Sequence, residues 1–179
     1  MTVPLPSDQR PKVTFERERG IYALRVTHDV AHAVVYFTEN STRTASIQKT
    51  FNVLAEAGIP LFLVKLHQTS VTFAVAGYDL PNAEKALSAA DLKMKTRRDL
   101  AVVTIVAAAM REISGVMVAI SDALYTAGAR LYEMGDSHDS VQCLIEAERA
   151  EEAVAVLCRT FDLGSDCVQE LRLSAEDTA

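Results

Sequence analysis

LAEAG at Leu54–Gly58 and LYTAG at Leu124–Gly128 are two forms of one segment, and they stand 70 residues apart. The same offset, without gaps, relates Ala45 with Gly115, Leu61 with Leu131, Ser70-Val71 with Ser140-Val141, Ala83 with Ala153, and Leu87 with Leu157. Two copies of one small module therefore make up most of the chain. A tandem of small modules is more typical of a binding or regulatory protein than of a self-contained enzyme.

The composition fits two small modules and excludes some partners. The chain has 179 residues, of which 49% are hydrophobic, and a net charge of −6 at pH 7. A domain of roughly 60–70 residues has a marginal core, so we expect the copies to pack on each other or on a second chain. Nucleic acid and membrane are not expected partners, because both need a basic face. The basic residues between the copies are interpreted as a solvated linker: Lys93, Lys95, Arg97 and Arg98.

The cysteines and the N-terminus indicate the compartment. Cys143, Cys158 and Cys167 are odd in number and have no CxxC spacing, which favours free thiols in a reducing environment. Residues 1–12 carry three prolines and have no apolar core of signal-peptide length, and no segment approaches the roughly 20 apolar residues of a membrane span. We therefore expect a cytoplasmic protein with a frayed N-terminal tail.

Hydrophobic periodicity predicts the order β-α-β-β-α in each copy. The first copy is expected to have strands at 33–37, 61–66 and 70–76 and helices at 44–57 and 81–87. The second copy is expected to have strands at 101–107, 130–134 and 140–145 and helices at 115–127 and 150–161. Gly58 and Gly128 follow the first helix of each copy, where glycine readily adopts the left-handed conformation that ends a helix.

This order, with one further strand, is an α+β ferredoxin-like sandwich with an antiparallel sheet. The second copy can take its fourth strand from 167–173 or from 21–27, although 21–27 could instead form a hairpin with 13–18. The first copy has only 91–96 available, so strand exchange between the copies is an expected feature. The predicted division is a tail at 1–19, a first domain at 20–96 and a second domain at 97–179.

No catalytic, metal-binding or cofactor-binding motif stands out in the chain. The motifs GxxxxGK[ST], GxGxxG and GxSxG are absent. His28 and His32 are four residues apart, but they fall in a predicted turn and strand with only Asp29 nearby, so we interpret them as structural or surface residues. Three residues between the last paired strands are interpreted as turn residues: Asp136, His138 and Asp139. We expect no catalytic residue, no metal site and no cofactor.

One element, present in both copies, is suited to a ligand. A buried strand leads through a polar loop to a helix N-terminus, where free backbone N–H groups and a partial positive charge favour a carboxylate. The loops offer Thr42, Thr44 and Ser46 in the first copy and Arg111, Ser114 and Gly115 in the second. The alternative is structural, with Thr44 or Ser114 simply capping its helix.

The stretch from Val102 to Asp166 resembles the second ACT domain of aspartate kinases. The residues that carry this resemblance are Ala109-Met110-Arg111, Ser114-Gly115-Val116, Leu124–Gly128, Ser137 and Ala153–Phe161. The first copy is similar to the first ACT domain of the family through VTHDVAHAVVYF at 26–37 and LAEAGIP at 54–60. The kinase domain that precedes this region in the family is missing, so the resemblance is to a regulatory subunit or a free-standing ACT protein.

The resemblance implies a non-catalytic protein that binds an amino-acid effector and regulates a metabolic enzyme, as a homodimer or on that enzyme. The ligand-binding residues that it implies are Asn40, Ser41, Thr42, Thr44, Ala45, Ser46, Met110, Arg111, Ser114, Gly115, Val116, Arg130 and Leu131.

The loops depart from the family pattern. The family has an aspartate and Pro-Gly where this chain has Thr42, Thr44 and Ala45, and an asparagine where it has Pro60 and Arg130. Arg130 offers a partner for a carboxylate. The alternative hypothesis is a degenerate ACT pair that mediates assembly and binds no ligand.

Overall fold

The computed structural model describes residues 20–37, 42–108 and 113–174. The strands are β1 (Gly20–Tyr36), β2 (Phe62–Leu66), β3 (Ser70–Ala76), β4 (Met94–Ala108), β5 (Leu131–Asp136), β6 (Ser140–Glu146) and β7 (Val168–Arg172). The helices are α1 (Arg43–Glu56), α2 (Leu80–Ala89), α3 (Val116–Thr126) and α4 (Ala150–Phe161). The strands form one sheet in the order β2-β3-β1-β4-β6-β5, and β7 pairs with β1.

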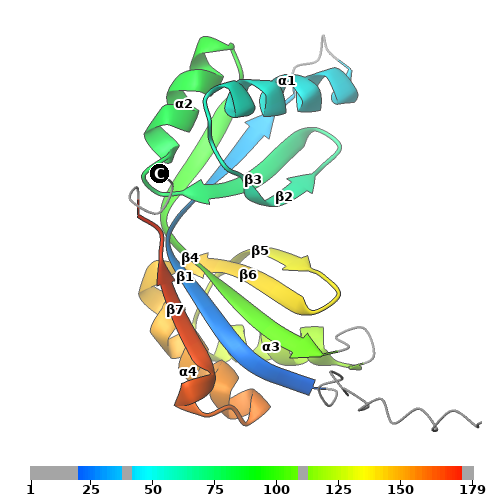
Figure 1. The fold of residues 1–179 in the computed structure, drawn as a ribbon. Helices are drawn as coiled ribbons and strands as arrows, with labels where there is room; N and C mark the ends of the chain where they lie inside the picture. Colours follow the sequence, from blue (N-terminus) through cyan, green and yellow to red (C-terminus); the bar gives the residue numbers. More distant parts are fainter. Residues whose placement is uncertain (1–19, 38–41, 109–112, 175–179) are drawn as a thin grey trace, which may run out of the picture.

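The long antiparallel strands β1 and β4 run through both halves of the molecule (Figure 1). Near their middle, Val30 pairs with Leu100. We call residues 30–37 and 42–97 the first lobe, and residues 20–28, 100–108 and 113–174 the second lobe. In both lobes the helices lie on the outside, and the hairpins β2–β3 and β5–β6 face the junction between the lobes.

Each long strand changes register where it passes from one lobe to the other. The pairing of β1 with β4 shifts on both sides of Val30. Asp29 and Asp99, which are 70 residues apart, have φ angles of 59° and 57°. Aspartate enters this left-handed conformation more readily than most residues because its short polar side chain can form local hydrogen bonds. Such bulges increase the twist of a strand, so the sheet turns between the lobes.

The first lobe has its own apolar core. Leu54 of α1 and Leu80 and Leu87 of α2 pack against Phe73 of β3 and Val35 of β1, and all five side chains are fully buried. The leucines fall on one face of each helix because their spacing follows the helical period. Residues 94–97 of β4 pair with β1 and supply the fourth strand of this lobe, which overlaps the expected strand at 91–96.

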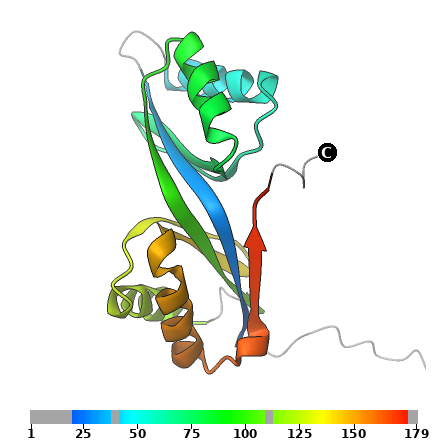
Figure 2. The same ribbon diagram turned by 90° about the vertical axis from the view of Figure 1, so that its left-hand side faces the viewer.

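The second lobe repeats this plan with a separate core. Ile120 and Leu124 of α3, Leu157 of α4 and Ile105 of β4 are buried together with Leu24 of β1. The N-terminal part of β1 pairs with β4 and takes the fourth-strand position, and β7 then pairs parallel to β1 (Figure 2). Both candidate strands for this copy are therefore used, and the expected strand exchange is present.

Helix ends follow the glycine pattern of the sequence. Gly58 and Gly128 have φ angles of 69° and 65°. The N–H of each glycine donates to the carbonyl three residues back, Ala55 and Tyr125 respectively, which closes the helix. The predicted bounds of the α4 helix, 150–161, coincide with the observed ones.

Some expectations about the strands were wrong. Residues 21–27 and 33–36 belong to one continuous strand, so 27–32 is not a turn, and residues 13–18 of the proposed hairpin lie outside the described part. Lys95, Arg97 and Arg98 are exposed but lie on β4, not on a linker, because β4 begins at Met94. The apolar runs marked only the most buried parts of β1 and β4, because polar exposed residues stand in the first part of β4 and at Arg25 and Asp29 within β1.

Candidate functional site

The N-terminus of α1 is capped by a threonine. The hydroxyl oxygen of Thr42 accepts a hydrogen bond from the backbone N–H of Ala45 at 3.3 Å, so Thr42, and not Thr44, is the capping residue. Thr44 and Ala45 are exposed, whereas Ser46 is buried and its carbonyl accepts from the Thr50 hydroxyl at 2.8 Å. Ser46 therefore serves the packing of α1. Two other predicted ligand residues, Asn40 and Ser41, lie outside the described residues.

The N-terminus of α3 has no side-chain cap. Gly115 occupies the capping position with a φ angle of 78°, and no side chain accepts a hydrogen bond there. Ser114 is exposed and does not cap the helix, contrary to the structural alternative. The first N–H groups of a helix have no intrahelical partner, so this end of α3 can receive a carboxylate. Two predicted ligand residues of this loop, Met110 and Arg111, lie outside the described residues.

A hollow of about 290 Å³ lies beside this helix end. Its lining is mostly apolar, and the residues are Gly20, Ile21, Ile113, Ser114, Gly115, Val116, Ala119 and Phe161. The hollow thus joins a polar helix end to an apolar wall. An amino acid offers the matching groups, since its carboxylate would suit the helix end and an apolar side chain would suit the wall.

Arg130 and Leu131 are not brought to Gly115. They follow the C-terminal end of α3, and a helix of 11 residues is about 16 Å long. The backbone N–H of Arg130 donates to Oε2 of Glu146 at 2.7 Å, and the Arg130 guanidinium lies 5.3 Å from the centre of the Tyr132 ring. Within one chain Arg130 and Leu131 therefore lie at the opposite end of α3 from Gly115, and their role in ligand binding stays a prediction.

The two predicted ligand loops lie at opposite ends of one chain. β1 leads to the α1 loop and β4 leads to the α3 loop, and the two strands are antiparallel, with Gly20 opposite Ala108 and Val35 opposite Met94 (Figure 1). A strand of about 15 residues spans roughly 50 Å. A site that joins both loops therefore needs a second chain.

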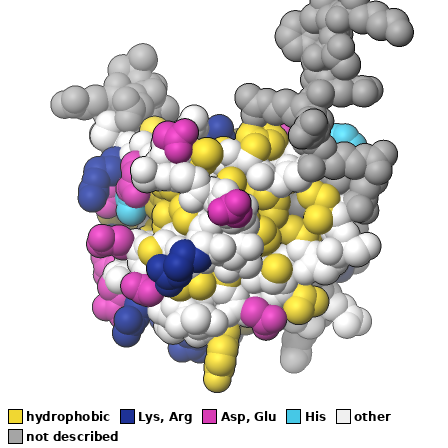
Figure 3. All heavy atoms as spheres, turned by 90° about the horizontal axis from the view of Figure 1, so that it is seen from below, with side chains coloured by type: hydrophobic (Ala, Val, Ile, Leu, Met, Phe, Trp, Pro, Cys, Tyr) yellow, Lys and Arg dark blue, Asp and Glu magenta, His cyan; other side chains and the backbone are white. Residues whose placement is uncertain are grey.

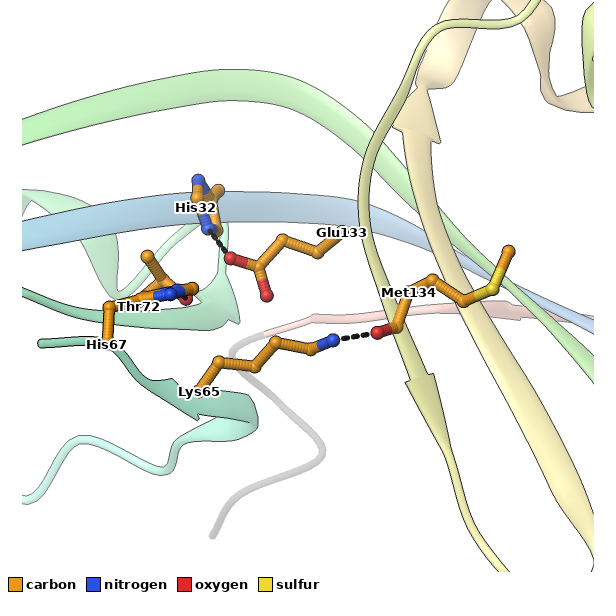
Figure 4. Close-up of polar contacts among 6 residues, drawn as sticks. All are labelled: His32, Lys65, His67, Thr72, Glu133 and Met134. Carbon is orange, nitrogen blue, oxygen red and sulfur yellow. Dashed lines mark hydrogen bonds and ion pairs between the residues drawn. The ribbon is translucent and has the colours of Figure 1, made fainter. Parts of the chain in front are cut away.

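The junction between the lobes holds a polar cluster that sequence reasoning missed (Figure 4). Nε2 of His32 on β1 lies 3.2 Å from Oε1 of Glu133 on β5, and their side chains are 11% and 7% exposed. Nζ of Lys65 on β2 donates to the carbonyl of Met134. One signal was available, because the equivalent of Glu133 in the first copy is Leu63 and a charge replaces an apolar residue there.

The junction changes the pKa of Glu133. Burial raises it, but the hydrogen bond with His32, the hydroxyl of Thr72, and the charges of His32 and Lys65 favour the ionised form, and the net result is a lowered pKa. Oε2 of Glu133 is buried and has no hydrogen-bond partner among the described residues. The carboxylate is therefore held in the junction mainly through Oε1 and its charged neighbours.

The requirements of a metal site and of a nucleophile bear on the other titratable side chains of the described residues. Among them, no group of three or more His, Cys, Asp or Glu side chains could hold a metal ion. Nε2 of His28 contacts Oε2 of Glu170 at 2.5 Å, which gives that histidine a structural partner. Burial raises the pKa of the Cys143 thiol to about 12, so it remains protonated and a poor nucleophile. Within the described residues, no helix is long and apolar enough to cross a lipid bilayer.

Comparison with protein families gives a match in the second half of the chain. Residues 95–159 match the family model of the ACT domain. The match covers part of the second half of the chain and is a likeness to that domain. No curated protein sequence matches the chain. The first lobe has the same order of elements at the offset of 70 residues, so the two lobes share one plan.

Solved structures extend the likeness to both lobes. The regulatory subunit of aspartate kinase from Thermus flavus shares 22% identity and a TM-score of 0.70, over 79% of this chain and 99% of that one. The structure of aspartokinase alpha and beta subunits has 21% sequence identity with this chain and a TM-score of 0.73, over 80% of this chain and 100% of that one. Aspartokinase III from E. coli has 17% sequence identity with this chain and a TM-score of 0.72, over 82% of this chain and 35% of that one. The expected α+β ferredoxin-like fold is confirmed.

Proposed function

We propose that this chain is a non-catalytic regulatory protein that binds an amino acid through its paired ACT domains and controls a metabolic enzyme allosterically. The observation that carries the proposal is the likeness of 79% of this chain to nearly the whole of an aspartate kinase regulatory subunit, together with the ACT match at 95–159. Aspartokinase III from E. coli has been solved with lysine and aspartate in a T-state and with aspartate and ADP in an R-state. Such a pair of states is what an allosteric effector requires.

The uncapped start of α3 supports a ligand site in the second lobe. The carboxylate of the amino acid is proposed to meet the N–H groups at Gly115 and Val116, and its side chain to enter the hollow lined by Ile21, Ile113 and Phe161. The shape and lining of this hollow favour an effector with an apolar side chain. The α1 end is less available because Thr42 already caps it.

A homodimer is part of the proposal, because the α1 and α3 loops lie at opposite ends of one chain. Two chains related by a twofold axis can bring the α1 loop of one against the α3 loop of the other. Apolar side chains are exposed on α3, where Val118 is 64% and Tyr125 is 87% exposed. Figure 3 shows apolar side chains on this end of the second lobe. The division at 96 and 97 and a cytoplasmic location remain parts of the proposal.

A thermal-shift screen against the twenty amino acids tests ligand binding. A ligand that binds only the folded state stabilises it by RT ln(1 + c/Kd) at a free ligand concentration c, so the melting temperature rises with the logarithm of the ligand concentration above Kd. We expect a response to one or a few apolar amino acids and none to their amides, which lack the carboxylate. No response to any of the twenty would remove the amino-acid proposal.

The exposed α3 surface also favours a second candidate function, an ACT pair that mediates assembly and binds no ligand. Val118 and Tyr125 would then contact a second chain. The α1 loop, which is already capped by Thr42 and carries Ala45, would bind no effector. This candidate predicts a stable dimer whose melting temperature does not respond to any amino acid. Sedimentation of the wild-type chain and of Tyr125→Lys, with the thermal screen on both, separates the two candidates.

A further inference from the structure

The two lobes have separate apolar cores and share only a small third cluster. The buried residues of this junction cluster are Val30, Ala74, Leu100, Val102 and Leu144, and the partly buried Phe62, Leu63, Tyr132 and Leu173 pack against them. On one side of the junction a hollow of about 420 Å³ separates parts of the lobes, and its lining includes Asp29, Gly77, Asp99 and Ala147. The apolar contact between the lobes is therefore limited. Polar contacts across the junction have a correspondingly large influence on how one lobe sits on the other.

The polar contacts across the junction converge on strand β5. Glu133 of β5 is held by His32 of β1, and the carbonyl of Met134 accepts from Lys65 of β2. In the close-up, these side chains reach across from the first lobe to the second (Figure 4). The 7% exposure of the Glu133 side chain means that its charge has little contact with water. A buried carboxylate is tolerated only where its partners stay in place, so the first lobe has to keep a position that provides them.

We infer that His32, Lys65 and Glu133, with the Met134 carbonyl, form an interlobe latch that fixes the orientation of the two lobes. This inference does not rest on amino-acid binding. The latch selects one arrangement because a rotation of either lobe would leave the buried Glu133 carboxylate without His32. It also makes the arrangement dependent on protonation. The titratable or charged groups that face Glu133 are His32 on β1 and Lys65 on β2. The Thr72 hydroxyl on β3 also faces Glu133 and forms a hydrogen bond with Nε2 of His67.

The orientation of the lobes can be measured with two spin labels in the full chain. Asn52 of α1 and Asp122 of α3 are exposed, occupy equivalent positions 70 residues apart, and lie on the outer helices of the two lobes. Both would be replaced by cysteine and labelled after Cys158→Ala and Cys167→Ser; the buried Cys143 stays. Dilution with unlabelled protein restricts the measured distances to one chain.

Three variants separate the latch from a general loss of packing. Glu133→Leu removes the acceptor for His32, and we expect a broader or shifted distance distribution at neutral pH. Glu133→Gln keeps an acceptor but loses the charge, as the protonated carboxyl group does, so it should already show at neutral pH the distribution that the wild type reaches on acidification. The matched control is Glu170→Gln, which changes the other His–Glu pair of the chain, where the Glu170 side chain is 62% exposed and lies on β7. That control should leave the distribution unchanged.

Acidification provides the second measurement. Protonation of Glu133 weakens the latch, so the wild-type distribution should broaden on acidification while that of Glu133→Gln should respond much less. An unchanged distribution in folded Glu133→Leu overturns the inference. If Glu133→Leu does not fold, the acid series decides, and an acid response equal in the wild type and Glu133→Gln overturns it.

Discussion

Glu133 is a carboxylate with a 7% exposed side chain at the junction between the lobes. Its neighbours favour the charged form strongly enough to lower its pKa despite burial. A carboxyl group whose pKa is lower in the folded than in the unfolded state stabilises the fold above its ordinary pKa. That stabilisation is lost as the pH falls through the folded-state pKa. The junction should therefore be a place where acid destabilises the protein.

Replacement of Glu133 should change both the stability and its pH dependence. Glu133→Leu leaves His32 without its buried partner, and we expect a loss on the order of 1–3 kcal/mol in the free energy of unfolding at neutral pH. Glu133→Gln should flatten the decrease of stability below the ordinary glutamate pKa. Urea denaturation across acidic and neutral pH measures both. An acid dependence in Glu133→Gln as steep as in the wild type, with Glu170→Gln as the control, would contradict this account.

Gly115 is the residue on which the proposed ligand site depends most. An added Cβ meets no atom within 4 Å, so the cost of a side chain comes from the φ angle of 78° alone. At Gly128, an added Cβ likewise meets no atom within 4 Å and the φ angle is 65°, but this residue lies at the other end of α3. We expect Gly115→Ala and Gly128→Ala each to lower the free energy of unfolding by about 1–2 kcal/mol. Thermal and urea denaturation measure this; an unchanged stability in Gly115→Ala would argue against the left-handed conformation.

At the scale of the elements, the helices could be predicted from the sequence more fully than the long strands. The α4 helix has apolar residues at Ala153, Leu157 and Phe161 and was predicted with its observed bounds, because helical periodicity and packing agree. β1 was predicted only in pieces, because the bulge at Asp29 interrupts the alternation and its middle passes between two cores. Local patterns do not report such long-range pairing.

The candidate site was predictable only in part. A glycine before α3 was visible in the sequence, and the structure shows that it leaves the helix end uncapped. The prediction of Thr44 as the α1 cap failed because the helix already begins at Arg43. Thr42 therefore stands at the capping position, and its hydroxyl oxygen accepts from the N–H of Ala45. Arg130 was predicted as a ligand residue from a family position at the start of the strand after α3, and within one chain the length of α3 separates it from Gly115. Glu133 was missed because burial depends on the packing of one lobe against the other.

The separate cores of the two lobes predict separable effects of core substitutions. Leu54 of α1 and Leu124 of α3 are equivalent positions and are 0% and 1% exposed. Either leucine-to-alanine change should cost about 2–5 kcal/mol. Hydrogen exchange should show lost protection mainly in the lobe that carries the change, since local openings follow cooperative units. Equal losses in both lobes for both variants would show one cooperative core instead.

At the scale of the whole molecule, the antiparallel strands β1 and β4 determine what one chain can do alone. They hold the α1 and α3 loops at opposite ends, so one chain cannot close a ligand site between them. The same strands connect both lobes, and a change at either loop can reach the junction through β1 or β4. The proposed regulation therefore needs a second chain to complete the site and a junction that has more than one arrangement.

Calorimetric titration of the purified full chain with the amino acids that respond in the thermal screen tests the central claim most directly. The account predicts a saturable heat for at least one apolar amino acid, weakened in Gly115→Ala and preserved in Gly128→Ala, because only Gly115 lies at the uncapped start of α3. Both variants carry a left-handed strain, so stability alone cannot explain a difference between them. The absence of a saturable heat for any of the twenty amino acids, or equal binding by both variants, would contradict the account.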